Sequence, residues 1–180
     1  RASAYRWVRR AAIHPDYSFD ARVDPERVRN DIALLELHHP IRKSRVVPFL
    51  TDIRPRKGQR IGLVSYARGR SDAPSLQEIC AVLARQHGVL VMSCDVDFGS
   101  SGAPVFSFEH GEPRIVSVIS AMAEVDGRKV ALGTQLERPL QLLMERLHTV
   151  QGPEIEDAAR LFSSGKNRET GAKFAKPSAE

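Results

Sequence analysis

The chain has 180 residues, which is enough for one folded domain or for one domain with a tail. Hydrophobic residues make up 42% of it and charged residues 27%, and the formal net charge is +5. The basic residues are scattered, and no basic stretch contains interleaved aromatic side chains, so we expect no nucleic-acid partner. No run of about eighteen apolar residues is present, so the sequence predicts no membrane-spanning helix.

Short β-like runs bounded by turn residues follow one another along most of the chain. Residues 15–30 are polar and rich in turn formers, so they are expected to form a loop. Many short strands at close spacing indicate an all-β barrel or sandwich. The predicted strands are residues 7–13, 32–37, 60–66, 79–83, 89–93, 103–108, 115–121 and 129–134.

The pattern changes near the end of the chain. Pro139 suits the first turn of a helix, and apolar residues then recur at i, i+3, i+4 and i+7. These residues are Leu140, Leu143, Met144 and Leu147. They predict one amphipathic helix over residues 137–148. The polar tail, residues 149–180, is expected to be largely disordered.

The two cysteines lie on the arms of a predicted β-hairpin. Cys80 and Cys94 stand at similar distances on either side of a turn at residues 85–88. Cross-strand partners lie within disulfide reach, so the hairpin favours a Cys80–Cys94 bond, with two free core thiols as the alternative. Two cysteines cannot complete a four-ligand zinc site, and no histidine pair stands beside them at ligand spacing. We expect no metal and no cofactor.

Residues 94–108, CDVDFGSSGAPVFSF, contain a Gly-x-Ser-Gly-x-Pro motif in front of a predicted strand. A serine that performs acyl transfer needs a base, preorganised donors for the oxyanion and a rigid backbone. Gly99 allows a positive φ, so its N–H and the N–H of Ser101 can converge on one oxygen. By itself the motif is also compatible with an ordinary glycine-serine turn.

Two motifs together resemble those of the trypsin-like serine peptidases, which have the chymotrypsin fold. The corner at residues 99–104 resembles their Gly-Asp-Ser-Gly-Gly-Pro motif, with Ser100 and Ala103 as departures. Residues 30–35, NDIALL, resemble the segment that carries the triad aspartate. The resemblance implies that Ser101 is the nucleophile and that Asp31 orients the catalytic imidazole. The position of Cys94 before the serine is similar to the compact bacterial branch of the family.

The resemblance covers about residues 5–148 and implies a trypsin-like double β-barrel whose N-terminal barrel is incomplete. The implied peptidase domain, 1–148, consists of the remainder of the first barrel (1–45), a second barrel (46–136) and a C-terminal helix (137–148). The implied function is that of a serine endopeptidase acting on a protein or peptide substrate in an extracellular or periplasmic location. The alternative is a non-catalytic homologue that serves as a binding module.

The mechanism also needs a histidine, which the family supplies from a segment upstream of the aspartate. No such segment occurs in this sequence, and each histidine present is expected to have a structural or surface role. These are His14, His38, His39, His87, His110 and His148. We therefore expect that the chain is N-terminally truncated, that its catalytic histidine is missing, and that it is inactive by itself.

Three further residues are candidates for substrate binding. Ser120 and Ala121 are similar to the strand with which the family pairs the substrate backbone. Asp95 lies six residues before Ser101, the offset at which trypsin carries its pocket aspartate, which implies cleavage after Arg or Lys. The alternative is that Asp95 only caps the turn that follows Cys94.

Overall fold

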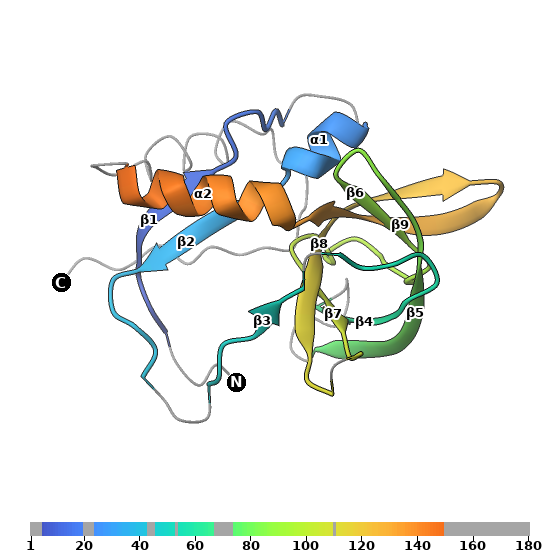
Figure 1. The fold of residues 1–180 in the computed structure, drawn as a ribbon, viewed down its shortest axis with the longest axis horizontal. Helices are drawn as coiled ribbons and strands as arrows, with labels where there is room; N and C mark the ends of the chain where they lie inside the picture. The colour runs from blue at the N-terminus through green and yellow to red at the C-terminus, as the bar shows by residue number, and fades with distance from the viewer. Residues whose placement is uncertain are drawn as a thin grey trace.

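The computed structural model describes residues 5–19, 24–42, 46–52, 54–66, 74–109 and 111–149. The predicted disordered tail, apart from its first residue, lies outside these ranges. The main body is a closed antiparallel barrel with the strand order β8-β7-β4-β5-β6-β9, in which β9 pairs back onto β8 (Figure 1). Its strands are β4 (Arg60–Ser65), β5 (Ser75–Gln86), β6 (Val89–Met92), β7 (Pro104–Ser107), β8 (Arg114–Val125) and β9 (Arg128–Gln135).

Alternating apolar side chains fill this barrel, because successive residues of a strand point to opposite faces of the sheet. Burial of each large apolar side chain contributes about 1.5–3 kcal/mol. At Gly133 the strands approach so closely that a Cβ would overlap the Ser117 hydroxyl. The core includes Ile61, Leu63, Val82, Leu90, Met92, Val105, Val116, Ile119 and Ala131.

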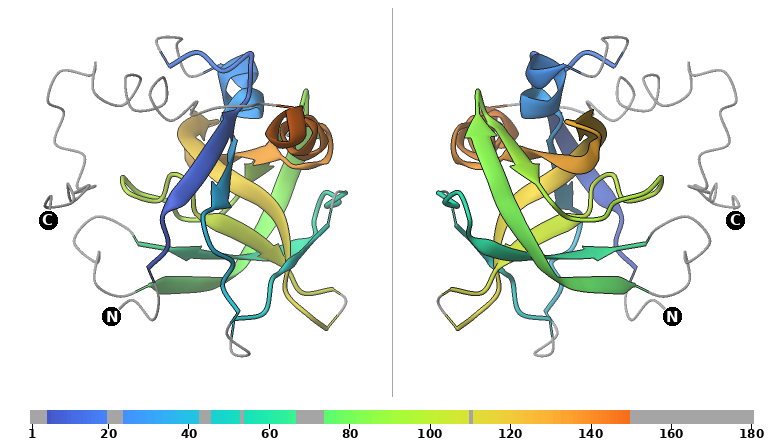
Figure 2. Two further views of the ribbon diagram at one scale, coloured as in Figure 1. Left: turned by 90° about the vertical axis from the view of Figure 1, so that its left-hand side faces the viewer. Right: turned by 90° about the vertical axis from the view of Figure 1, so that its right-hand side faces the viewer.

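A second, two-stranded antiparallel sheet precedes the barrel in the chain. It consists of β1 (Val8–Ile13) and β2 (Ala33–Leu37). The C-terminal helix α2 (Glu137–Thr149) packs on this hairpin, and Leu143 of the helix is fully buried (Figures 1 and 2). The amphipathic pattern of residues 137–148 therefore has a clear cause, because its apolar side covers the hairpin.

Two elements differ from expectation. The predicted loop at residues 15–30 contains the helix α1 (Pro25–Asn30), and the short strand β3 (Leu50–Thr51) pairs in parallel with β8. The Asp24 side chain caps α1 by accepting the Arg27 N–H at 2.8 Å, and Pro25 occupies the first turn. The prediction of an unbroken loop was wrong because a helix of only six residues, with Val28 as its buried apolar side chain, is too short to show a helical periodicity.

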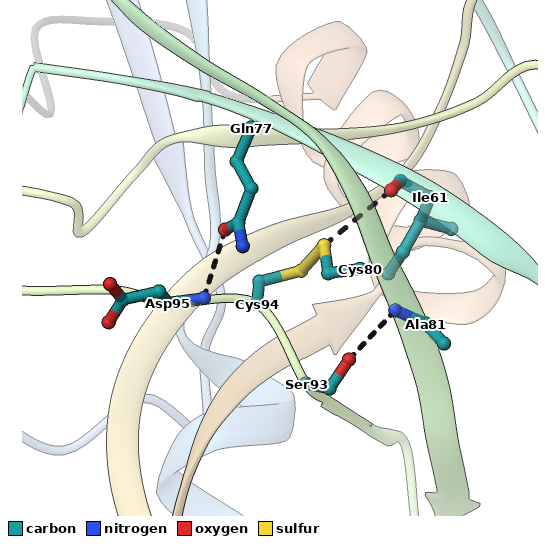
Figure 3. Close-up of a disulfide and its surroundings, with 7 residues drawn as sticks. All are labelled: Ile61, Gln77, Cys80, Ala81, Ser93, Cys94 and Asp95. Atoms are coloured by element: carbon teal, nitrogen blue, oxygen red, sulfur yellow. Dashed lines mark hydrogen bonds between the residues drawn. A yellow bond between two sulfur atoms is a disulfide. The ribbon is translucent and has the colours of Figure 1, made fainter.

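The predicted disulfide is present between Cys80 on β5 and Cys94 after β6, with a Cα–Cα distance of 4.8 Å (Figure 3). The Ser93 hydroxyl accepts a hydrogen bond of 2.9 Å from the Ala81 N–H beside it. Two links therefore tie β5 to the segment that leads from β6 into the Gly-x-Ser-Gly corner. Neither described helix has the length and apolar character needed to cross a bilayer.

Candidate active site

Ser101 lies on an exposed turn between two glycines that have positive φ angles. Gly99 has φ of +94° and Gly102 has φ of +81°, which L-residues with a Cβ seldom adopt. The residue between Gly99 and Ser101 faces inward: Ser100 is only 2% exposed. The two glycines therefore permit a turn that presents Ser101 and buries its neighbour.

The backbone N–H groups of this turn point in different directions. The Ser100 N–H donates to the Asp97 carbonyl at 3.0 Å, so it is occupied within the turn. Within the described part of the chain, the N–H groups of Gly99 and Ser101 have no hydrogen-bond partner. An oxyanion hole needs two free donors that converge on one oxygen.

The turn is held against the middle of β8 by two backbone hydrogen bonds. The Gly102 N–H donates to the Ile119 carbonyl at 2.8 Å, and the Ile119 N–H donates to the Ala103 carbonyl at 3.0 Å. Ser120 is the next residue on β8. The corner and Ser120 therefore lie side by side, although they are separated in the sequence.

Ser120 connects this corner to Asp31. Its hydroxyl donates a hydrogen bond of 2.6 Å to Asp31 Oδ2, across 89 residues of sequence. The second carboxylate oxygen, Oδ1, has no hydrogen-bond partner among the described residues. The structure thus brings Ser101, Ser120 and Asp31 to one place, with one oxygen of Asp31 available to another group.

Thr134 on β9 also holds the Asp31 segment, a role that the sequence alone did not reveal. The Thr134 side chain is fully buried, and its hydroxyl lies within hydrogen-bond distance of the Val28 carbonyl at 2.6 Å and of the Asp31 carbonyl at 3.1 Å. The sequence around Thr134 gives no sign of partners more than a hundred residues away.

Residues of the β1–α1 connection hold the two chain neighbours of Asp31. Asn30 donates to the Asp16 carbonyl at 3.2 Å, and the backbone N–H of His14 donates to the Ile32 carbonyl. Burial raises the pKa of Tyr17, and the negative charge of Asp31 raises it further, while Arg27 opposes these effects. The Asp31 carboxylate is therefore close enough to act on the titration of Tyr17.

No histidine is hydrogen-bonded to Asp31 or to Ser101 within the described ranges. His14 is buried, and its Nδ1 accepts the Asp16 N–H at 3.3 Å. The other described histidines are exposed, and His110 lies outside the described residues. The exposed ones are His38 and His39 after β2, His87 in the β5–β6 turn and His148 near the end of α2.

Asp95 has an exposed carboxylate that points away from the disulfide beside it (Figure 3). Its backbone N–H donates to Gln77 Oε1 at 2.9 Å, which fixes the main chain at this point. The turn itself is capped by a different residue, because Asp97 Oδ1 accepts the Phe98 N–H at 2.7 Å. A capping role for Asp95 therefore finds no support in the hydrogen bonds.

One edge of β8 is open beside the corner. The strand pairs with β7 only as far as Val118, whereas its pairing with β9 continues to Val125, with Ala121 opposite Leu132. In the described part of the chain, the stretch from Ser120 onward therefore has a free backbone edge. Such an edge can add an extended peptide as a further strand.

No metal chemistry is indicated by the residues that the structure describes. Among them, no group of three or more histidine, cysteine, aspartate or glutamate side chains is placed to hold a metal ion. The chemistry available at the corner is that of a hydroxyl, two free N–H groups and a carboxylate.

Comparisons with known proteins agree on the fold. A family model described as "Trypsin-like peptidase domain" matches residues 6–114. The solved structure of kallikrein-related peptidase 10 superposes with a TM-score of 0.58 at 16% sequence identity, and the match covers 81% of this chain and 74% of that one. No curated protein matches the chain. At this identity the structural likeness supports the fold only.

Proposed function

Because the chain belongs to the trypsin-like peptidase domain family, we propose that it is a serine endopeptidase that cleaves peptide bonds through an acyl-enzyme on Ser101. The predicted trypsin-like fold is confirmed by the family match and the structural likeness. The observation that carries the proposal is the 2.6 Å hydrogen bond from Ser120 to Asp31, next to the corner that presents Ser101.

In the proposed reaction, Ser101 Oγ attacks the scissile carbonyl and its proton passes to an imidazole. The free oxygen Oδ1 of Asp31 accepts the other N–H of that imidazole, while Ser120 holds Oδ2 in place. The N–H groups of Gly99 and Ser101 receive the oxyanion as the carbonyl becomes tetrahedral. The imidazolium protonates the leaving amine, and a water molecule then hydrolyses the acyl-enzyme.

The proposal assigns the general base to a histidine outside the residues that the structure describes. None of the described histidines is hydrogen-bonded to Asp31, and His14 is engaged with Asp16 instead. Without a base the hydroxyl of Ser101 is close to unactivated. Loss of one triad member leaves about 10³–10⁴-fold catalysis over water, so the present chain alone is expected to be nearly inactive.

Substrate binding is proposed at the open edge of β8. A peptide in extended conformation would pair with the backbone from Ser120 and Ala121 onward, which places its scissile bond near Ser101. Asp95, with its exposed carboxylate, is the proposed partner of an Arg or Lys before that bond. The disulfide supports an extracellular or periplasmic location, because such bonds persist in oxidising compartments.

Labelling of the native full-length protein with a fluorophosphonate probe tests the proposal. We expect covalent modification at Ser101, located by mass spectrometry, because the probe reports an activated serine. Asp31→Asn should slow the labelling by about 10³-fold or more, since the imidazole would lose its oriented tautomer. Ser101→Ala should abolish it, whereas Ser18→Ala, which changes an exposed serine whose hydroxyl makes no hydrogen bond within the described residues, should have no effect.

The rival function is that of a non-catalytic binding module with the same fold. The observation that favours it is the lack of a histidine at Asp31 among the described residues. If the native protein fails to react with the probe while an active serine peptidase reacts under the same conditions, the binding module is the better conclusion. Labelling that persists in Ser101→Ala would also remove Ser101 from the mechanism.

A further inference from the structure

An open hollow of about 850 Å³ lies on the barrel away from the Ser101 corner. Its walls come from Asp52 and residues 54–57 before β4, from Arg85 near the end of β5 and from Glu109 after β7. The Ser101 corner precedes β7, whereas Glu109 follows it. β7 has four residues and is therefore about 13 Å long. The hollow and the corner lie at opposite ends of this strand.

Cationic side chains dominate the hollow. Arg54, Arg56, Lys57 and Arg85 line it, against the carboxylates of Asp52 and Glu109. Arg54 is paired with Glu137 at 3.2 Å. The other three cations have no ion pair within the part of the chain that the structure describes.

The backbone that carries these cations is fixed to the barrel. Pro55 is fully buried, and the Arg56 N–H donates to Gln59 Oε1 at 2.7 Å. Gln59 in turn donates to the buried Ser107 hydroxyl at 2.7 Å, and the Gly58 N–H donates to the Val82 carbonyl at 2.8 Å. The cations therefore project from a preorganised segment, which lowers the entropy lost when a ligand binds.

We propose that this hollow binds an acidic peptide segment of a partner or substrate protein, and that Arg56, Lys57 and Arg85 pair with its carboxylates. Guanidinium groups match carboxylates in a bidentate geometry. The hollow has room for only a few residues of chain, and among the described residues that line it none is an aromatic side chain on which a base could stack. Asp52 and Glu109 oppose a continuous phosphate backbone. The binding does not depend on catalysis at Ser101.

Fluorescence anisotropy of a labelled octapeptide of Asp and Glu tests the proposal on the 180-residue chain. We expect saturable binding that weakens as the salt concentration rises from about 50 mM to about 500 mM. Arg56→Gln combined with Lys57→Gln should reduce the affinity about five- to tenfold, and the further change Arg85→Gln should reduce it again. Circular dichroism of each variant establishes that it is folded.

The chain contains a matched control, because Arg128 and Lys129 form another exposed Arg-Lys pair at the β8–β9 hairpin, outside the hollow. Arg128→Gln combined with Lys129→Gln makes the same change in net charge and should alter the affinity less than about twofold. Equal losses in the two double variants, absence of binding, or tighter binding of a single-stranded oligonucleotide of equal charge would each overturn the proposal.

Discussion

At the scale of single residues, Asp95 is the side chain that would decide what the proposed peptidase cleaves. Its carboxylate is exposed and free of the capping role that Asp97 performs. We predict that the native protein prefers Arg or Lys before the scissile bond. Asp95→Ala should lower kcat/KM for these substrates about 30- to 100-fold. This factor corresponds to the loss of about 2–3 kcal/mol, which is typical of a hydrogen bond to a charged group. A panel of peptides that differ only at this residue measures the change.

The same panel contains its own control, because peptides with Leu before the scissile bond cannot pair with a carboxylate. Asp95→Ala should leave kcat/KM for Leu peptides within about twofold, since the backbone of Asp95 is held by Gln77 and does not need its side chain. A parallel fall for Leu and Arg peptides would mean that Asp95 supports the fold and does not select the substrate.

At the scale of elements, α1 and the Asp31 segment depend on β9 for their position. The buried Thr134 hydroxyl lies within hydrogen-bond distance of the Val28 and Asp31 carbonyls, which link the helix to the barrel. We predict that Thr134→Val lowers the free energy of unfolding by about 1–3 kcal/mol, because it removes the donor from buried acceptors and keeps the shape. Chemical denaturation measures this loss.

Hydrogen exchange distinguishes a local effect from a global one. In Thr134→Val, amides of α1 should exchange faster than amides of β4–β6, because the hydroxyl that is removed holds α1 and the Asp31 segment to the barrel. Thr134→Ser keeps the hydroxyl and should recover at least half of the lost stability. Uniform acceleration across the barrel, or no recovery by serine, would show that the methyl packing of Thr134 matters more than its hydrogen bonds.

The strands of the barrel could be predicted from the sequence because their apolar residues and turn signals are local. The Cys80–Cys94 bond was predictable for the same reason, since one hairpin places both cysteines. α1 and β3 could not be predicted: one is a helix of only six residues, and the other is a two-residue strand defined only by its parallel partner β8. The contact of Ser120 with Asp31 was also not predictable, because it joins a barrel strand to the residue that ends α1, 89 positions earlier in the sequence.

At the scale of the whole molecule, the proposed site is divided between two bodies. The closed barrel carries Ser101 and the open edge of β8, whereas the hairpin β1–β2 and helix α1 carry Asp31. The two bodies are joined at the site by Ser120 and Thr134 and elsewhere by α2, which packs on the hairpin. A group that weakens this joint, meaning the contacts of Ser120 and Thr134 with the Asp31 segment, changes the geometry of the site without contacting a substrate.

His14 is such a group, because it is buried at the end of β1 beside this joint. Burial lowers the pKa of His14 from its ordinary value of 6.5; Asp16 opposes this shift, and the charges of Arg146 on α2 and Arg29 on α1 add to it. The unfolded chain therefore binds a proton at a higher pH than the folded chain does. The contribution of neutral His14 to the stability of the folded state is fully present above pH 6.5. It is lost as the pH falls toward the lowered pKa of His14 in the folded state.

We predict that the free energy of unfolding falls between about pH 7.5 and about pH 5, and that His14→Gln makes this fall smaller because glutamine does not titrate. Chemical denaturation of both proteins across this range measures the difference. His148→Gln, which changes an exposed histidine on α2, should follow the original protein. If His14→Gln and the original protein lose stability in parallel as the pH falls, the protonation of His14 does not control the joint between hairpin and barrel.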